Sequence, residues 1–125
     1  MLETIDLKQL KKEDITNTAK SFSERLCNTE GFKSTQLRKY YNNLMALKSK
    51  YSGITSESRA IELDLGIFAS KVEYGMIKNI KERNAFKFYK DNVIGLSDKV
   101  KTGEQFKNFM IVMEAIVAYF PKQKD

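Results

Sequence analysis

Apolar side chains recur at three- and four-residue steps along most of the chain, the pattern of helices that bury one face. No stretch keeps the two-residue alternation of a half-buried strand, and no repeat interrupts the pattern. Because the connections are short, we expect successive helices to be antiparallel neighbours. The predicted helices run from near Asp14 to near Cys27, from Ser34 or Thr35 to about Tyr51, from just after Thr55 or Ser56 to about Asn79, from Asn84 or Ala85 to near Lys101, and from Phe106 to Phe120.

The last of these stretches is apolar on nearly every side. Large apolar residues repeat on one face from Phe106 to Phe120, the opposite side carries more of them, and Glu114 is the only charge between Met110 and Phe120. A helix of this kind is buried on most sides. We therefore predict an all-α fold, a compact five-helix bundle with the C-terminal helix at its centre. The bundle is expected to form a single domain over residues 1–125, with residues 1–12 able to fray because their periodicity is weaker.

Local signals support these boundaries. Thr102 and Gln105 have the spacing of a capping box, which satisfies free N–H groups at the start of a helix. Pro121, the only proline, cannot continue the last helix. Gly66 and Gly75 interrupt the third helix, where each costs about 1 kcal/mol against alanine. We expect close packing or a local bend at these two positions.

Composition removes much of the chemistry that an enzyme would use. The chain has no histidine, which is the commonest general base and metal ligand. Cys27 is the only cysteine, so no internal disulfide exists. The nearest carboxylate cluster, Glu57, Glu62 and Asp64, fits no motif and is interpreted as a solvated helix flank. We predict no catalytic residue, no metal site and no cofactor.

The same composition favours a cytoplasmic protein without a membrane anchor. No apolar run approaches the ~20 residues that cross a bilayer. The first six residues include Glu3 and Asp6 where a secretory signal would carry cations.

Positive charge is concentrated in and around the second helix. The formal charge is +6 and the isoelectric point about 9.3, a surplus that attracts polyanions. Residues 31–56 contain no Asp or Glu, so nothing within this segment neutralises its cations. Either a nucleic-acid-binding surface or a merely solubilising one would carry such charge. Spacing places Lys39 and Lys50 on the outer face of the second helix and Arg38 at its flank; the full set is Lys33, Arg38, Lys39, Lys48 and Lys50.

A second basic row lies on the third helix. Lys71, Tyr74 and Lys78 follow one flank at steps of three and four residues, and Arg83 extends the charge into the next turn. Alternating ammonium and aromatic groups suit a nucleic-acid backbone with an occasional stacked base. The competing interpretation is that Tyr74 packs at the rim of the bundle while the lysines are only solvated.

Three segments resemble one known family. They are Ser34–Lys39, Lys71–Gly75, and the pair Phe106 and Phe109 followed by Glu114–Tyr119. In order, spacing and helical setting they resemble the small helical subunit of type III-A CRISPR effector (Csm) complexes. The chain departs from the family pattern at Ser70, Glu73 and Phe120-Pro121.

The resemblance implies a non-catalytic assembly role. Family members stack as a filament and line the path of guide RNA and target RNA. The implied partners are other Csm subunits, copies of the chain itself and both RNAs. Arg38 and Lys71 match basic positions of the family, whereas Lys33, Lys39, Lys48, Lys50, Lys78 and Arg83 are added from charge placement alone.

Besides an enzyme that uses Lys, Tyr or Glu, which the composition disfavours, two alternatives remain open from the sequence. One is a helical protein-interaction adaptor or homodimer without nucleic acid, whose contacts would be Phe88 and an exposed face of the last helix. The other is the small subunit of a type III-B complex, which is also all-helical.

Overall fold

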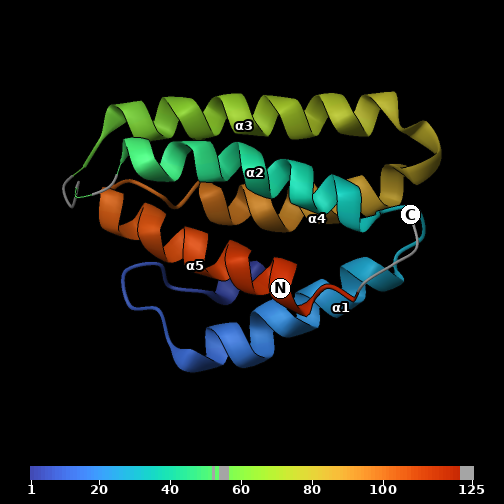
Figure 1. Ribbon diagram of the computed structural model, residues 1–125, viewed down its shortest axis with the longest axis horizontal. Helices are drawn as coiled ribbons and strands as arrows, with labels where there is room; N and C mark the ends of the chain where they lie inside the picture. Colours follow the sequence, from blue (N-terminus) through green and yellow to red (C-terminus); the bar gives the residue numbers. More distant parts are fainter. Residues whose placement is uncertain (52, 54–56, 122–125) are drawn as a thin grey trace.

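Five α-helices form the protein in the computed structural model, which describes residues 1–51, 53 and 57–121 (Figure 1). No strand occurs among these residues, only an isolated bridge between Glu57 and Thr102, and the all-α prediction is confirmed. A π-helical segment, η2 (Asp14–Ala19), continues directly into α1, so the first predicted helix is present as a composite. The remaining elements are η1 (Leu2–Thr4), α1 (Lys20–Asn28), α2 (Ser34–Lys50), α3 (Arg59–Lys78), η3 (Ile80–Glu82), α4 (Arg83–Ser97) and α5 (Gly103–Tyr119).

Capping explains where α2, α3 and α5 begin. The predicted capping box is present at the start of α5. The Gln105 N–H donates to Thr102 Oγ at 3.1 Å, and the Thr102 N–H donates to Gln105 Oε1 at 3.2 Å. The N-cap of α2 is Lys33 rather than Ser34 or Thr35. The backbone of Lys33 is extended, and its N–H donates to Gln36 Oε1 at 2.8 Å. The predicted caps of α3, Thr55 and Ser56, lie outside the described residues, and Ser58 caps that helix.

The end of α4 differs from the prediction. The helix stops at Ser97, whereas periodicity suggested Lys101. Tight turns follow, in which the Lys99 N–H donates to Leu96 O at 3.1 Å and the Val100 N–H to Ser97 O at 3.0 Å. Val100 lies in these turns but is still buried. Its position fits the apolar spacing of α4, and for this reason periodicity placed the end of the helix too late.

The C-terminal helix α5 lies at the centre of the bundle, as predicted. Figure 1 shows it between α2 and α1, and close contacts join it to both helices and to η2. Its large residues, such as Phe109 and Met113, are fully buried, and only a narrow strip that includes Ile111 reaches solvent. A helix that is apolar nearly all round gains most when other helices cover it on several sides.

This central position changes the expected order of neighbours. The helices α2, α3 and α4 pack in succession, but α1 packs on α5 and α4, and α5 packs mainly on α2 and α1. The expectation that every helix packs beside the next one is therefore wrong for α1 and α2 and for α4 and α5. In both cases the reason is the position of α5, which is inserted between α1 and α2.

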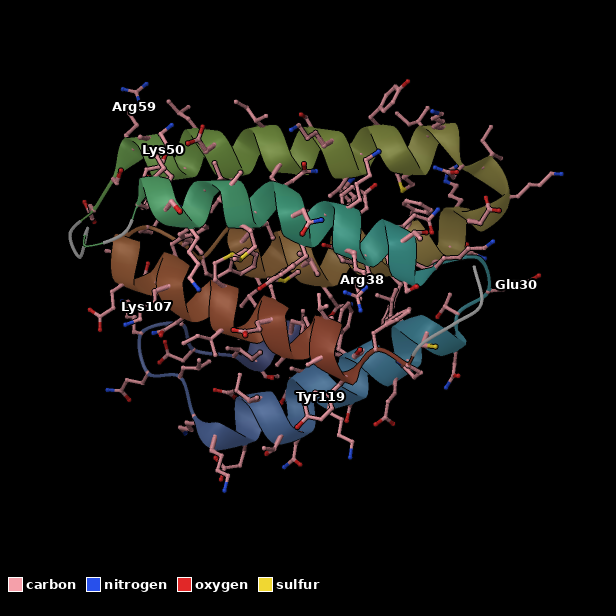
Figure 2. The ribbon with its side chains drawn as sticks, in the orientation of Figure 1. Glu30, Arg38, Lys50, Arg59, Lys107 and Tyr119 are labelled. Atoms are coloured by element: carbon pink, nitrogen blue, oxygen red, sulfur yellow. The ribbon has the colours of Figure 1, made fainter. Side chains whose placement is uncertain are left out.

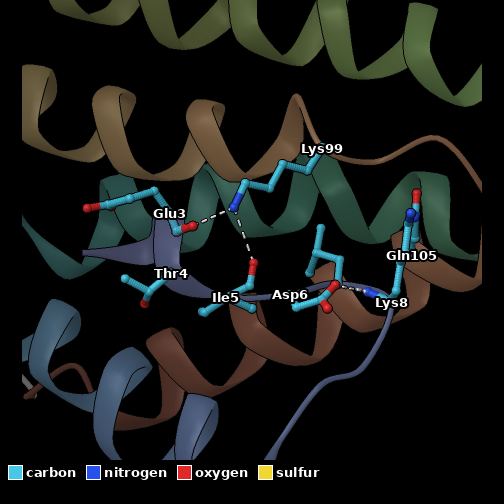
Figure 3. A pocket seen from close by; sticks show the side chains of 8 residues that line it. Glu3, Thr4, Ile5, Asp6, Lys8, Lys99 and Gln105 are labelled. Atoms are coloured by element: carbon cyan, nitrogen blue, oxygen red, sulfur yellow. Dashed lines mark hydrogen bonds between the residues drawn. The ribbon is translucent and has the colours of Figure 1, made fainter.

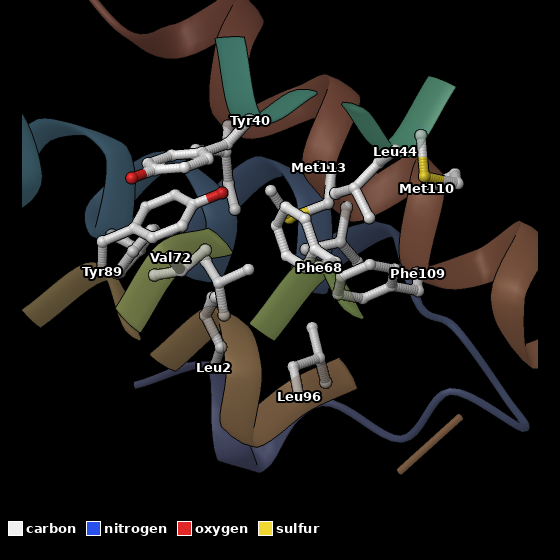
Figure 4. Packing of buried hydrophobic residues seen from close by; sticks show 14 of the residues in the cluster. Leu2, Tyr40, Leu44, Phe68, Val72, Tyr89, Leu96, Phe109, Met110 and Met113 are labelled. Carbon is white, nitrogen blue, oxygen red and sulfur yellow. The ribbon is translucent and has the colours of Figure 1, made fainter. Parts of the chain in front are cut away.

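An aromatic cluster fills the space where α2, α3 and α4 meet (Figure 4). The Tyr40 and Tyr89 rings stack with centroids 5.3 Å apart, and Phe68 and Phe86 meet Tyr40 edge to face. Burial raises the pKa of the Tyr89 phenol well above its ordinary value, so this residue stays neutral. Phe88, which was considered as an exposed contact, instead stacks on Phe22 of α1 at 5.1 Å.

The two glycines of α3 have different surroundings. A Cβ at Gly75 would collide with the Tyr40 hydroxyl, which confirms the prediction of close packing there. Gly66 is exposed and a Cβ there would meet nothing within 4 Å, so close packing is absent at Gly66.

Residues 1–12, which weak periodicity left able to fray, pack against the bundle. Leu2, Ile5 and Leu7 are almost completely buried. The Lys99 ammonium donates to the carbonyl oxygens of Glu3 and Ile5 (Figure 3). Two asparagines of the bundle also bind this segment. The Leu2 N–H donates to Asn92 Oδ1 of α4 at 3.0 Å, and Asn108 Nδ2 of α5 donates to Leu7 O at 2.8 Å. These are contacts across the whole sequence, which periodicity within the segment cannot show.

Candidate nucleic-acid interface

A groove of about 530 Å³ lies between the first half of α2 and the second half of α3. Aromatic side chains line it from α2, α3 and α4, amide and hydroxyl side chains line it from α2 and α3, and three lysines contribute cationic groups. The lining residues are Gln36, Lys39, Tyr40, Asn43, Ser70, Lys71, Tyr74, Gly75, Lys78, Asn79 and Phe86.

The three groove lysines come from two helices. Lys71 and Lys78 are seven residues apart on α3, which places them on one flank, and Lys39 reaches the groove from α2. All three are exposed, and none of them forms an ion pair within the described residues. The structure thus joins three of the predicted RNA-binding residues around one concave surface without a neutralising carboxylate.

Gly75 allows the groove to have an aromatic floor. Because it lacks a Cβ, the Tyr40 hydroxyl of α2 approaches the backbone of α3 directly. Tyr40 is 5% and Phe86 1% exposed, so both rings are fixed by the core beneath them. The floor of the groove is therefore part of the rigid bundle.

Tyr74 projects from the groove instead of packing at the rim of the bundle. Its side chain is 65% exposed, although it stands between Lys71 and Lys78 on α3. The competing interpretation, in which Tyr74 packs at the rim and the lysines are merely solvated, is wrong with respect to this ring. An exposed aromatic ring between two cations is available for stacking.

Other predicted cations lie outside the groove. Lys33 stands at the start of α2 and Arg83 at the start of α4. Lys48 is exposed but does not line the groove. Figure 2 shows Arg38 on the side of α2 away from α3, and Lys50 on the side facing α3. The predicted residues consequently do not form one continuous row.

Lys50 is neutralised by the neighbouring helix. Its ammonium lies 2.9 Å from Asp64 Oδ2 of α3, and the Tyr51 hydroxyl donates to the same oxygen. These hydrogen bonds, first from Tyr51 and then from Lys50, lower the pKa of Asp64 below its ordinary value. Residues 31–56 contain no acids, but this cation is still neutralised, because the carboxylate comes from α3. Lys39 and Lys50 are both exposed, and both lie on the side of α2 that is next to α3.

The carboxylates considered for catalysis are separated by their own partners. Glu62 pairs with Lys101 at 2.9 Å, and Asp64 belongs to the Lys50 pair. Within the described part of the chain, no group of three Cys, Asp or Glu side chains is placed to hold a metal ion. No helix in the same part is long and apolar enough to cross a membrane.

Sequence reasoning missed an apolar stripe on the outer face of α3. Leu63, Ile67, Tyr74 and Ile77 are 56–65% exposed, and Ile80 beyond the helix is 75% exposed. Their spacing of four, seven and three residues is itself helical, so the signal was present beside the buried stripe. In Figure 1, α3 forms one edge of the bundle, which leaves this face without a covering helix. An exposed apolar stripe of this kind is a candidate interaction surface.

Fold and surface together define a small, basic, all-helical protein with a candidate polyanion groove and an exposed apolar face. The sequence model of the family described as Csm2 Type III-A matches residues 9–124, and the chain belongs to that family. It is therefore a small subunit of type III-A CRISPR complexes, and it associates with other Csm subunits. The match identifies type III-A rather than type III-B. Comparisons with curated proteins and with solved structures found no significant match.

Proposed function

We propose that this chain is a non-catalytic subunit that binds the backbone of guide or target RNA in the cytoplasm and stacks with copies of itself. The observation that carries the proposal is the convergence of Lys39, Lys71 and Lys78 on one groove. Of the remaining predicted residues, Lys33, Arg38, Lys48 and Arg83 would add cations outside the groove. Lys50 would contribute less, since Asp64 already neutralises it.

Lysines suit a task in which the bound sequence varies. An ammonium group contacts a phosphate oxygen without reading the base, so affinity is independent of sequence. Each contact with a single strand releases counterions and contributes about −0.7 to the slope of log K against log salt concentration. Three groove lysines would together account for a slope of about −2.

The aliphatic part of the stripe on α3, formed by Leu63, Ile67 and Ile77, supports the stacking part of the proposal. Exposed side chains such as Ile67 and Ile77 would be covered by the next copy of the chain, which removes apolar surface from water. A homodimer that binds no RNA would use the same stripe, and RNA binding separates these two functions.

The test compares two triple variants with equal loss of charge. Lys39→Ala, Lys71→Ala and Lys78→Ala together remove the groove cations. The control replaces the exposed lysines Lys11, Lys12 and Lys107, none of which lines the groove. RNA binding is measured from low to moderate salt for the isolated protein and for the reconstituted Csm complex.

We expect the groove variant to bind less RNA and to flatten the salt slope by about 2, while circular dichroism shows an unchanged helical signal. The control should keep most of the slope. Equal losses in both variants would mean that only net charge matters, and wild-type binding by the groove variant would refute the assigned surface.

A further inference from the structure

The groove combines features that a phosphate backbone alone does not require. Its floor is aromatic, its mouth carries Tyr74, and polar side chains line it from both helices. Its volume of about 530 Å³ falls within the range of about 300–1,000 Å³ that small-molecule sites occupy. A single nucleotide fits such a space, whereas a base held within a duplex cannot enter it.

Within the part of the chain that the structure describes, the polar lining retains unused hydrogen-bonding capacity. Gln36 Oε1 accepts from the Lys33 N–H, so its amide NH₂ group can still donate. Asn79 Nδ2 donates to Gly75 O at 2.8 Å, which leaves its carbonyl oxygen as an acceptor. Ser70 Oγ donates to Ile67 O at 2.6 Å and can still accept. The groove therefore offers both a donor and acceptors to the edge of a base.

We propose that the α2–α3 groove binds one unpaired RNA nucleotide, with its base stacked on Tyr74, its edge facing the polar side chains, and its phosphates held by Lys71 and Lys78. This inference rests on the proposed RNA-binding function and adds a preference for single-stranded or extruded nucleotides over regular duplex. Because the polar groups can serve more than one base, the preference concerns pairing state and not sequence.

The test uses single-stranded RNA that carries one 2-aminopurine, a strand of the same length in which every nucleotide is abasic, and a fully paired duplex. Tyr74→Ala is compared with Tyr74→Phe, which keeps the stacking ring, and with Tyr119→Ala as a control on α5. Tyr74 is largely exposed, so its removal leaves the core intact; circular dichroism checks this. Sedimentation reports whether each variant changes self-association.

Tyr74→Ala should weaken binding of single-stranded RNA by about 5- to 160-fold and abolish the change in 2-aminopurine fluorescence. Tyr74→Phe should stay within about twofold of wild type, as a sequence-tolerant stacking role requires. Abasic RNA should bind wild type and Tyr74→Ala equally, and so should the duplex.

Failure of this inference is distinguishable from failure of the proposed function. If Tyr74→Ala binds single-stranded RNA like wild type while the lysine variant does not, the groove binds backbone only and the nucleotide site is refuted. If Tyr74→Ala alters self-association alone, the ring belongs to a protein interface and the inference is equally wrong. If the lysine variant also binds normally, both proposals are overturned.

Discussion

The same substitution at two positions of α3 should change stability in opposite directions. Gly66→Ala adds a methyl group where nothing lies within 4 Å. Alanine is favoured over glycine inside a helix by about 1 kcal/mol, so the free energy of unfolding should rise by about 0.5–1 kcal/mol. Gly75→Ala has the same helical benefit, but its methyl group collides with the Tyr40 hydroxyl.

The cost of that collision follows from how Tyr40 is held. Its ring is 5% exposed and stacks on Tyr89, so it cannot swing away freely. Overpacking of this kind costs about 1–3 kcal/mol. After the helical gain of about 1 kcal/mol is subtracted, Gly75→Ala should lower the free energy of unfolding by about 0–2 kcal/mol.

Tyr40→Phe removes the colliding hydroxyl and isolates the cause. The nearest remaining atoms to a Cβ at residue 75 would be Phe86 Cε1 at 3.3 Å and the ring carbon Cζ of residue 40 at 3.5 Å. Combining Tyr40→Phe with Gly75→Ala should therefore recover most of the loss and give a positive coupling in a double-mutant cycle.

Urea denaturation of the four variants measures these changes, with Gly66→Ala as the matched control. Thermal midpoints should follow at roughly 3–5 °C per kcal/mol for a chain of this size. If Gly75→Ala stabilises the protein as much as Gly66→Ala does, or if the double variant shows no recovery, the close approach of α2 to α3 is wrong.

Two further predictions concern the surfaces beside the groove. The Tyr51 hydrogen bond lowers the folded-state pKa of Asp64 from its ordinary 3.8, so this contribution is present above about pH 4 and is lost as the pH falls through the lowered value. Asp64→Asn should thus lower the free energy of unfolding by about 1 kcal/mol at pH 7 and by progressively less in acid, as measured by denaturation at several pH values. The control Asp91→Asn, in an exposed i,i+4 pair, should change the free energy of unfolding little. Equal effects of the two substitutions would contradict the assignment. Ile67→Glu with Ile77→Glu should leave the monomer folded but reduce its incorporation into reconstituted Csm complexes, as measured by size-exclusion chromatography; full incorporation would exclude the stripe as the stacking surface.

Much of the fold follows from local patterns in the sequence. The apolar residues around α5 predict a central helix, and the Thr102–Gln105 spacing predicts where it starts, because both signals act within one or two turns. The docking of residues 1–12 could not be predicted in the same way. It depends on Asn92, Lys99 and Asn108, which are about 90 to 100 residues away along the chain.

The candidate site was likewise predictable only where it depends on local spacing. Lys71, Tyr74 and Lys78 are related by helical spacing, so the sequence shows that they share a flank. Their meeting with Lys39 depends on how α2 and α3 pack, as does the pairing of Lys50 with a carboxylate from another helix. Local charge counting cannot detect a neutralising partner that only tertiary structure supplies.

The central place of α5 also affects how the protein is made. The earlier helices leave the ribosome first, but the surfaces of α1 and α2 that cover α5 have no apolar partner until residues 103–119 have been synthesised. Domains generally fold as units during translation, and this one lacks its core until nearly all of its helical residues are available. Folding is therefore expected to be completed late, and until then the nascent chain keeps apolar surface open to chaperones.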